Sequence, residues 1–102
     1  EQVAVTAIRP GVEAEEVDGK VRNFYAEKGW DGKFVHHTGH PAGSPWGPWL
    51  IKGRREPLKE GMVLALEPGL YEKGLAGVRL EVDVVVRKDG AEVLGSLPLR
   101  MW

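Results

Sequence analysis

The chain has 102 residues, the length of one domain, and 42% of them are apolar, which allows a modest hydrophobic core. Its 14 basic and 15 acidic residues nearly cancel, so its charge gives no reason to expect a nucleic-acid or membrane partner. There is no cysteine and no apolar run near the ~20 residues that span a bilayer, which argues against disulfides, thiolate chemistry and a membrane-spanning helix. We therefore expect a cytoplasmic protein, and its few amides and many charged residues are typical of a thermophile.

The first third of the chain predicts a helix. Residues 1–8 have no capping signal before them and resemble the end of a helix or strand, and Arg9-Pro10-Gly11 then breaks the pattern. Glutamates gather at 13–16, where the helix dipole favours acidic side chains at a helix start. Apolar residues at helical spacing predict an amphipathic helix over about 12–28, followed by Gly29 as its C-terminal cap.

The middle of the chain predicts a short strand and a long loop. Residues 34–37 are a strand candidate, and residues 62–66 form an apolar run that predicts a second strand. Between them, residues 39–53 are rich in glycine, proline and tryptophan, which indicates a loop with chemistry or a lid.

The last third predicts antiparallel strands. Residues 70–77 are expected to be a hairpin connection, and residues 78–87 alternate apolar and polar side chains as a half-buried strand does. Asp89-Gly90 is a hairpin turn signal, and residues 91–94 are the expected return strand. A helix followed by mainly antiparallel strands predicts an α+β fold.

A histidine and two glutamates lie in settings that suit metal binding. His40 lies in a glycine-rich segment that contains all three histidines of the chain, Glu67 directly follows the apolar strand 62–66, and Glu81 belongs to the alternating strand. One imidazole and two carboxylates on separate segments form a mixed nitrogen and oxygen donor set for a divalent ion. Each also has a purely structural explanation, because a core histidine, a strand-end glutamate facing solvent and a solvated outer strand face are all common.

Four motifs then occur in consistent order and spacing over nearly the whole chain. They are Phe34-x-His36-x-Thr38-Gly39-His40-x-x-Gly43, Gly61-Met62-Val63-x-x-x-Glu67-Pro68-Gly69-x-Tyr71, Gly77-Val78-Arg79-x-Glu81 and Asp89-Gly90-x-Glu92-Val93-Leu94. Together they resemble the C-terminal half of the pita-bread metallopeptidases, chiefly the Xaa-Pro dipeptidases and aminopeptidases, which are related to methionine aminopeptidase and creatinase. The resemblance implies that residues 1–102 are a single partial domain, with a helix followed by a curved, mainly antiparallel sheet.

The resemblance also implies roles for individual residues. His40, Glu67 and Glu81 would bind a pair of divalent ions (Mn, Co or Zn), with Glu81 as a bridging ligand. His36 and Glu67 would be catalytic, and His36 and Arg79 would contact a peptide substrate, while His37 is expected to take no part. The implied reaction is hydrolysis of the peptide bond before proline.

Two departures from the family pattern shape our expectation of activity. The two aspartate ligands that the resemblance implies upstream have no counterpart, because Asp18 lies in the predicted helix and Asp31 in an Asp-Gly turn. A further histidine, seven residues after the metal ligand, is replaced by Gly47. We therefore expect that the N-terminal half of the domain is missing, and that this chain binds a metal pair poorly or not at all and is inactive alone.

Two other functions stay open at this point. One is a non-catalytic binding or assembly module derived from the family, and the other is a relative with non-peptide amidinohydrolase chemistry. In each case a half-domain would expose apolar strand surface, so we expect a homodimer or a higher oligomer.

Overall fold

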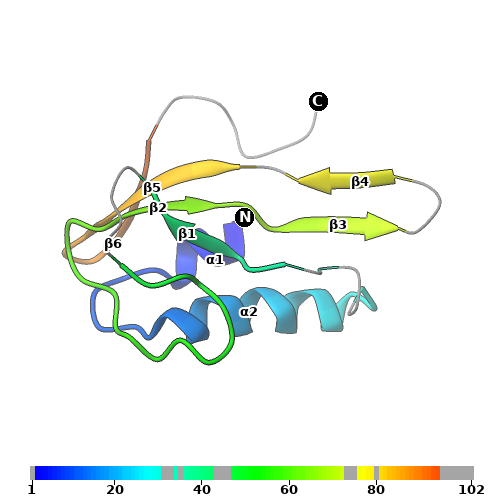
Figure 1. Ribbon diagram of the computed structural model, residues 1–102, viewed down its shortest axis with the longest axis horizontal. Helices are drawn as coiled ribbons and strands as arrows, with labels where there is room; N and C mark the ends of the chain where they lie inside the picture. The colour runs from blue at the N-terminus through cyan, green and yellow to red at the C-terminus, as the bar shows by residue number, and fades with distance from the viewer. Residues whose placement is uncertain are drawn as a thin grey trace.

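The computed structural model describes residues 2–30, 34, 36–42, 47–72, 76–79 and 81–94, with the backbone alone at 70–72 and 76–79. Two helices lie on one side of the strands (Figure 1). The helices are α1 (Gln2–Ala7) and α2 (Ala14–Glu27), and the strands are β1 (Gly39–Pro41), β2 (Val63–Leu66), β3 (Gly69–Glu72), β4 (Ala76–Arg79), β5 (Val82–Arg87) and β6 (Gly90–Val93). Neither helix of this described part is long and apolar enough to cross a membrane.

The strands pair in an antiparallel manner throughout the described part. Four of them form one sheet in the order β1-β2-β5-β6, and β3 pairs with β4 as a separate hairpin. This hairpin continues outward from the ends of β2 and β5 (Figure 1). The predicted α+β class with a mainly antiparallel sheet is therefore confirmed.

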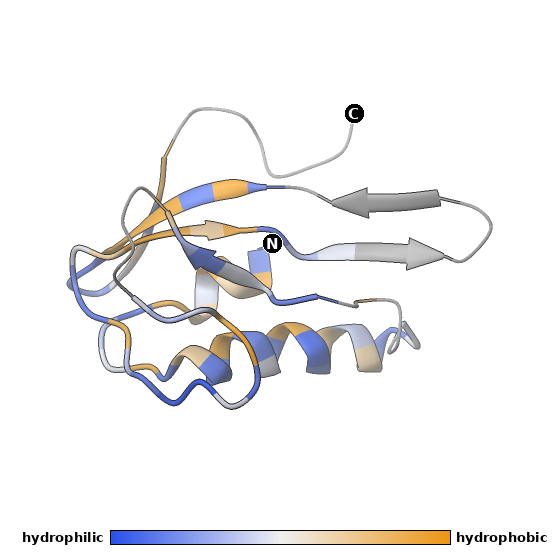
Figure 2. Ribbon diagram, in the orientation of Figure 1, coloured by the Kyte–Doolittle hydropathy of each residue, from blue (hydrophilic) through white to orange (hydrophobic). Residues whose placement is uncertain are grey.

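The core lies between the two helices and the central strands. Apolar side chains at helical spacing give α2 one buried face, which includes Val17 and Val21. Alternate residues of β2 and β5, among them Leu64 and Val84, are fully buried in the same cluster. Figure 2 shows the apolar character of both strands. Each such side chain contributes about 1.5–3 kcal/mol by leaving water, so this layer anchors the sheet to the helix.

The predicted helix is confirmed with slightly tighter bounds. It begins at Ala14, where the carboxylate of Glu16 accepts a hydrogen bond from the backbone N–H of Glu13 at 3.3 Å. It ends at Glu27, and Gly29 follows with a φ of +75°, the left-handed conformation expected of a C-terminal glycine cap.

The strand predicted at 34–37 is wrong for the described residues of that segment, because the strand begins later, at Gly39. The carbonyl oxygens of Phe34 and His36 accept hydrogen bonds from the guanidinium of Arg22, at 3.2 and 2.8 Å, instead of from a neighbouring strand. The expected loop at 39–53 correspondingly starts with β1, and Leu50 forms a bridge back to Gly39.

Two boundaries in the last third also differ from prediction. The expected single strand 78–87 is interrupted, since Glu81 lies outside both β4 and β5, and much of the expected connection 70–77 is strand. Arg87 pairs with Gly90, so the two turn residues are 88 and 89, one position earlier than predicted.

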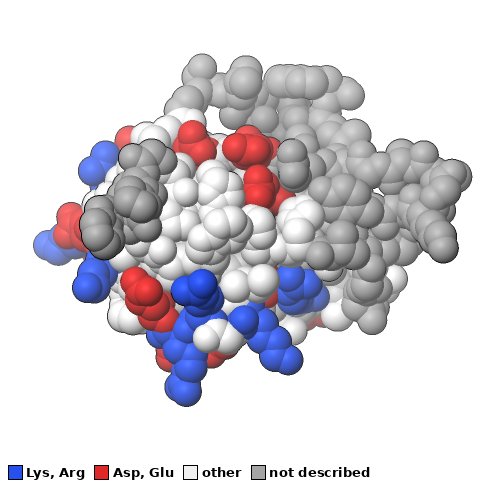
Figure 3. All heavy atoms as spheres, viewed as in Figure 1, with Lys and Arg blue, Asp and Glu red and all other residues white. Residues whose placement is uncertain are grey.

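Charge is unevenly spread over the surface. Figure 3 shows acidic side chains over the strands, whereas most basic side chains on that face lie nearer α2 and the loop that crosses it. Cations approaching the strands on this face therefore meet carboxylates first.

Candidate metal centre

The register of β1 against β2 creates the site. Gly39 pairs with Leu66 and His40 with Ala65, so Glu67, one residue beyond β2, lies opposite Thr38. The backbone N–H of Glu67 donates to the carbonyl of Thr38 at 2.8 Å, which fixes this arrangement. The two side chains that flank Thr38 and Gly39 in sequence, His37 and His40, are thereby held beside the Glu67 carboxylate.

Close approach of the two backbones requires a glycine. A Cβ atom on Gly39 would lie 2.5 Å from the carbonyl oxygen of Ala65 and within 3.2 Å of two leucine side chains. Real Cβ atoms do not approach oxygen so closely, so glycine lets β1 lie against β2 in this register.

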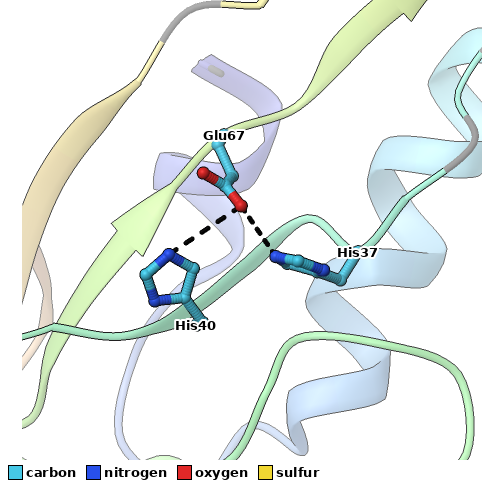
Figure 4. Close-up of side chains that lie close together, drawn as sticks. All are labelled: His37, His40 and Glu67. Atoms are coloured by element: carbon cyan, nitrogen blue, oxygen red, sulfur yellow. Dashed lines mark hydrogen bonds and ion pairs between the residues drawn. The ribbon is translucent and has the colours of Figure 1, made fainter.

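His37, His40 and Glu67 form the one group of at least three possible metal ligands within the part of the chain that is described. Nε2 of His37 lies 2.7 Å from Oε1 of Glu67, and Nε2 of His40 lies 3.8 Å from the same oxygen (Figure 4). One ligand atom from each residue lies within 4.8 Å of the others. Two ring nitrogens and a carboxylate oxygen therefore converge on a volume of the size of one ion.

A hydrogen bond from Nδ1 orients the His40 ring. Nδ1 lies 2.8 Å from the carbonyl oxygen of Pro41, and a carbonyl can only accept, so Nδ1 carries a proton. In the neutral ring, Nε2 then presents its lone pair towards Glu67, as metal-binding histidines do. The ring of Trp49 lies against both imidazoles, with centroids 4.6 Å from His37 and 5.3 Å from His40.

A buried polar network connects this site to α2. The hydroxyl of Thr38 donates to Oδ1 of Asp18 at 2.8 Å, and Nε of Arg22 donates to Oδ2 at 2.7 Å. Asp18 is 1% exposed, and these two bonds compensate for the burial of its carboxylate. Because Arg22 also binds the carbonyls of Phe34 and His36, α2 holds the chain on both sides of His37.

Only some of the residues predicted from the sequence belong to this group. The structure brings His40 and Glu67 together and adds His37, which was expected to take no part. His36 lies outside the group, with Nδ1 2.7 Å from the carbonyl of His37 and its ring 5.1 Å from that of Phe34. Glu81 is exposed and is not in the group, and the side chain of Arg79 lies outside the described residues.

The sequence contained partial signals for the site residues that the prediction missed. The crowding of three histidines into five residues signalled that His37 was near the site, but only the strand register decides which rings face Glu67. Asp18 and Arg22 stand four residues apart on the predicted helix, a spacing that indicates an ion pair but not its partners in the loop.

Gly47 replaces the histidine that the resemblance implies, and its backbone suits glycine. Its φ is +116°, a conformation that side chains with a Cβ rarely adopt. A Cβ there would meet Pro41 at 3.5 Å, which is ordinary contact, so the restriction comes from the backbone and not from crowding.

A hollow of about 400 Å³ lies elsewhere, at α1 and α2. Its lining contains none of the three residues of the metal group; it is formed by Gln2, Val3, Thr6, Ala7, Arg9 and Lys20. The hollow is therefore separate from the candidate site.

The α+β fold thus places two histidines and a glutamate, donors that a divalent ion accepts, where β1 and β2 adjoin. The chain belongs to metallopeptidase family M24, whose sequence profile matches residues 1–88. This confirms the family resemblance and the expected pita-bread class of fold.

Individual relatives agree with this membership. The chain is 41% identical over 100 residues to a probable dipeptidase PepE of Mycobacterium tuberculosis, covering 96% of this chain and 27% of that protein. It is 40% identical over 92 residues to an Xaa-Pro dipeptidase of Lactobacillus helveticus, covering 88% of this chain and 25% of that protein. The structure of an Xaa-Pro dipeptidase from Bacillus anthracis matches with a TM-score of 0.91 and 34% identity, over 98% of this chain and 29% of that one. The chain thus spans between a quarter and a third of the length of these relatives.

Proposed function

We propose that this chain carries one side of the two-metal centre of an Xaa-Pro peptidase, which hydrolyses the peptide bond before proline. In this proposal His40, Glu67 and Glu81 bind the divalent ions, Mn, Co or Zn, and His36 and Arg79 contact the peptide. The observation that carries it is the pairing of β1 with β2, which places Nε2 of His40 3.8 Å from Oε1 of Glu67 in a chain of family M24.

The residues present fit a divalent ion. His40 is oriented through its bond to the Pro41 carbonyl, and Glu67 is a buried carboxylate beside two imidazoles. Divalent ions in such a centre supply a water that ionises near neutral pH and polarise the scissile carbonyl. The chain's own contribution is to hold the Glu67 carboxylate where it can accept a proton and to exclude bulk water from that carboxylate.

The proposed centre needs ligands beyond these. Two aspartates that the resemblance implies have no counterpart in the 102 residues, and a pair of dications held by one imidazole and two carboxylates lacks anionic donors. We therefore propose that the chain alone does not hydrolyse peptides, that it works in the cytoplasm joined to or associated with further polypeptide, and that the isolated chain forms homodimers or larger oligomers.

A chimera tests this function. This chain would replace the matching segment of the Bacillus anthracis Xaa-Pro dipeptidase, and hydrolysis of an Xaa-Pro dipeptide would be measured with Mn²⁺ or Co²⁺. We expect hydrolysis about 10²–10³-fold slower than in the parent, because Gly47 removes one polar donor. The Glu67→Gln and Glu81→Gln chimeras should be inactive, and Glu60→Gln, a change at an exposed turn residue, is the matched control.

One observation favours a second candidate, a non-catalytic module. Gly47 has a backbone conformation that suits glycine, so this loop is built without the histidine that the resemblance implies. A chimera that folds and binds metal but shows no hydrolysis above the metal blank would favour the module and contradict the peptidase. A hydrolysis rate that Glu81→Gln leaves unchanged would also contradict the proposed ligand set.

A further inference from the structure

We propose that His37, His40 and Glu67 form a single-ion site for Zn²⁺ or Co²⁺ that is complete within this chain. This ligand set includes His37 and omits Glu81, so it differs from the two-metal set proposed above. It does not depend on peptidase activity, because all three ligands belong to two adjoining segments of one polypeptide.

The distances are close to those of an occupied site. A tetrahedral zinc ion with bonds of about 2.0–2.2 Å holds its ligand atoms about 3.3–3.6 Å apart. The two separations from Oε1 of Glu67, 2.7 Å to His37 and 3.8 Å to His40, lie on either side of this range. Each has to change by less than about 1 Å, which side-chain rotation provides without moving the strands.

The backbone that carries the ligands is already fixed. Thr38 donates its N–H to Leu50 and accepts from Glu67 through its carbonyl, at 3.0 and 2.8 Å, and its hydroxyl is bound to Asp18. His40 is held through Nδ1 by the Pro41 carbonyl. Little ordering entropy therefore remains to be lost when an ion binds, which favours affinity.

The chemistry of the donors selects the ion. Two imidazoles and one carboxylate are a ligand set that zinc accepts with an open fourth position. Mg²⁺ and Ca²⁺ prefer oxygen ligands throughout, so the two ring nitrogens discriminate against them. The His37 and His40 side chains are 21% and 31% exposed, which gives an ion and its remaining ligand a route from solvent.

Binding replaces a proton with the ion. In the present geometry Nε2 of His37 donates to Glu67, and this proton has to leave that nitrogen, to Nδ1 of the same ring or to solvent. The ion then takes the position of the shared proton between the imidazole and the carboxylate. The Glu67 carboxylate remains paired throughout, first with the imidazole N–H and then with the ion, and the bound dication leaves the group with one net positive charge beside its open fourth position.

Titration of the purified full chain with ZnCl₂ tests the site, by calorimetry and by Co²⁺ visible absorption. We expect one ion per chain. His37→Gln, His40→Gln and Glu67→Gln should each lower the affinity at least about 100-fold, since even outer-shell changes cost 10–100-fold. Glu81→Gln and the control Glu60→Gln, both at exposed positions, should leave it within about threefold.

A measurement on the unaltered chain covers the case in which a variant fails to fold. Zn²⁺ should shift the ¹⁵N resonances of the His37 and His40 rings more than those of His36, whose ring lies 5.7 Å from that of His37 but contributes no atom to the metal group.

Two results would overturn the single-ion site. The first is affinity that falls with Glu81→Gln and survives His37→Gln, which would support the two-metal ligand set instead. The second is a failure of the isolated chain to bind Zn²⁺ when both are present at about 100 µM. A preformed site should bind with a dissociation constant no weaker than on the order of 100 µM. Neither decides the peptidase proposal, which is tested separately by hydrolysis in the chimera.

Discussion

Thr38 and Asp18 are joined by a buried hydrogen bond of 2.8 Å between the Thr38 hydroxyl and the Asp18 carboxylate. Thr38 is fully buried, lies between the two imidazoles of the metal group in the sequence, and pairs through its backbone with Glu67. Asp18 belongs to α2 and also accepts from Arg22. The bond therefore joins the helix to the segment that carries the ligands. Its loss should lower both the free energy of unfolding and the metal affinity.

Asp18→Asn should destabilise the chain by about 1.5–3 kcal/mol, because a hydrogen bond to a charged group is lost and its buried partners are left poorly satisfied. Thr38→Val should cost about 1–2 kcal/mol for the same bond. Urea unfolding of both variants and of the double variant gives the coupling between them, which we expect to exceed 0.5 kcal/mol, as for residues in contact.

Thr6→Val is the matched control, since the Thr6 hydroxyl donates only to a carbonyl of its own exposed helix turn. It should change the stability by less than about 0.5 kcal/mol. Additive effects of Asp18→Asn and Thr38→Val would contradict the role of this bond.

Gly39→Ala should destabilise the chain by about 1–3 kcal/mol, because the new Cβ would press on the backbone of β2. The contact is with the carbonyl oxygen of Ala65 at 2.5 Å, and backbone atoms of a central strand cannot move aside cheaply. Thermal unfolding of this variant is compared with that of Gly90→Ala. Gly90 also lies in a strand but has nothing within 4 Å of its built Cβ, so alanine there should be tolerated. Equal destabilisation of the two variants would show that the β1–β2 contact is looser than the structure indicates.

The sequence was informative where local periodicity decides the structure. The apolar spacing of α2 and the alternation around Val84 predicted a helix and a strand, because one face of each is buried in the same core. The position of Gly29 predicted the helix end for an equally local reason, the need for a positive φ.

The sequence was uninformative where distant side chains or strand register decide it. Residues 34–37 look like a strand, but Arg22, twelve residues or more away, takes the carbonyls of Phe34 and His36. The choice of His37 over His36 as the neighbour of Glu67 depends on the pairing of Gly39 with Leu66, which no local pattern contains. His40 and Glu67 were singled out because four motifs in this order resemble one family, and the profile match to residues 1–88 confirms that family.

Gly47→Ala should destabilise the chain by about 1–3 kcal/mol, because alanine rarely adopts the φ of +116° found there. Gly19→Ala is the opposite control within the same chain. Gly19 lies inside α2 with nothing within 4 Å of a built Cβ, so alanine should stabilise the helix by about 0.5–1 kcal/mol. Denaturant midpoints of the two variants should move in opposite directions. A shift of both in the same direction would contradict the backbone conformation at Gly47.

Zn²⁺ should raise the free energy of unfolding of the chain, because the single-ion site exists only when β1 and β2 are paired. A ligand that binds the folded state alone adds about 2.7 kcal/mol when its free concentration is 100 times its dissociation constant. Thermal unfolding would be followed with ZnCl₂, then with excess chelator, which should restore the original midpoint. His37→Gln should remove the shift, while Glu81→Gln should retain it, because Glu81 is exposed and stands outside the metal group. A Zn²⁺ shift of equal size in His37→Gln would mean that the ion stabilises the chain from another site.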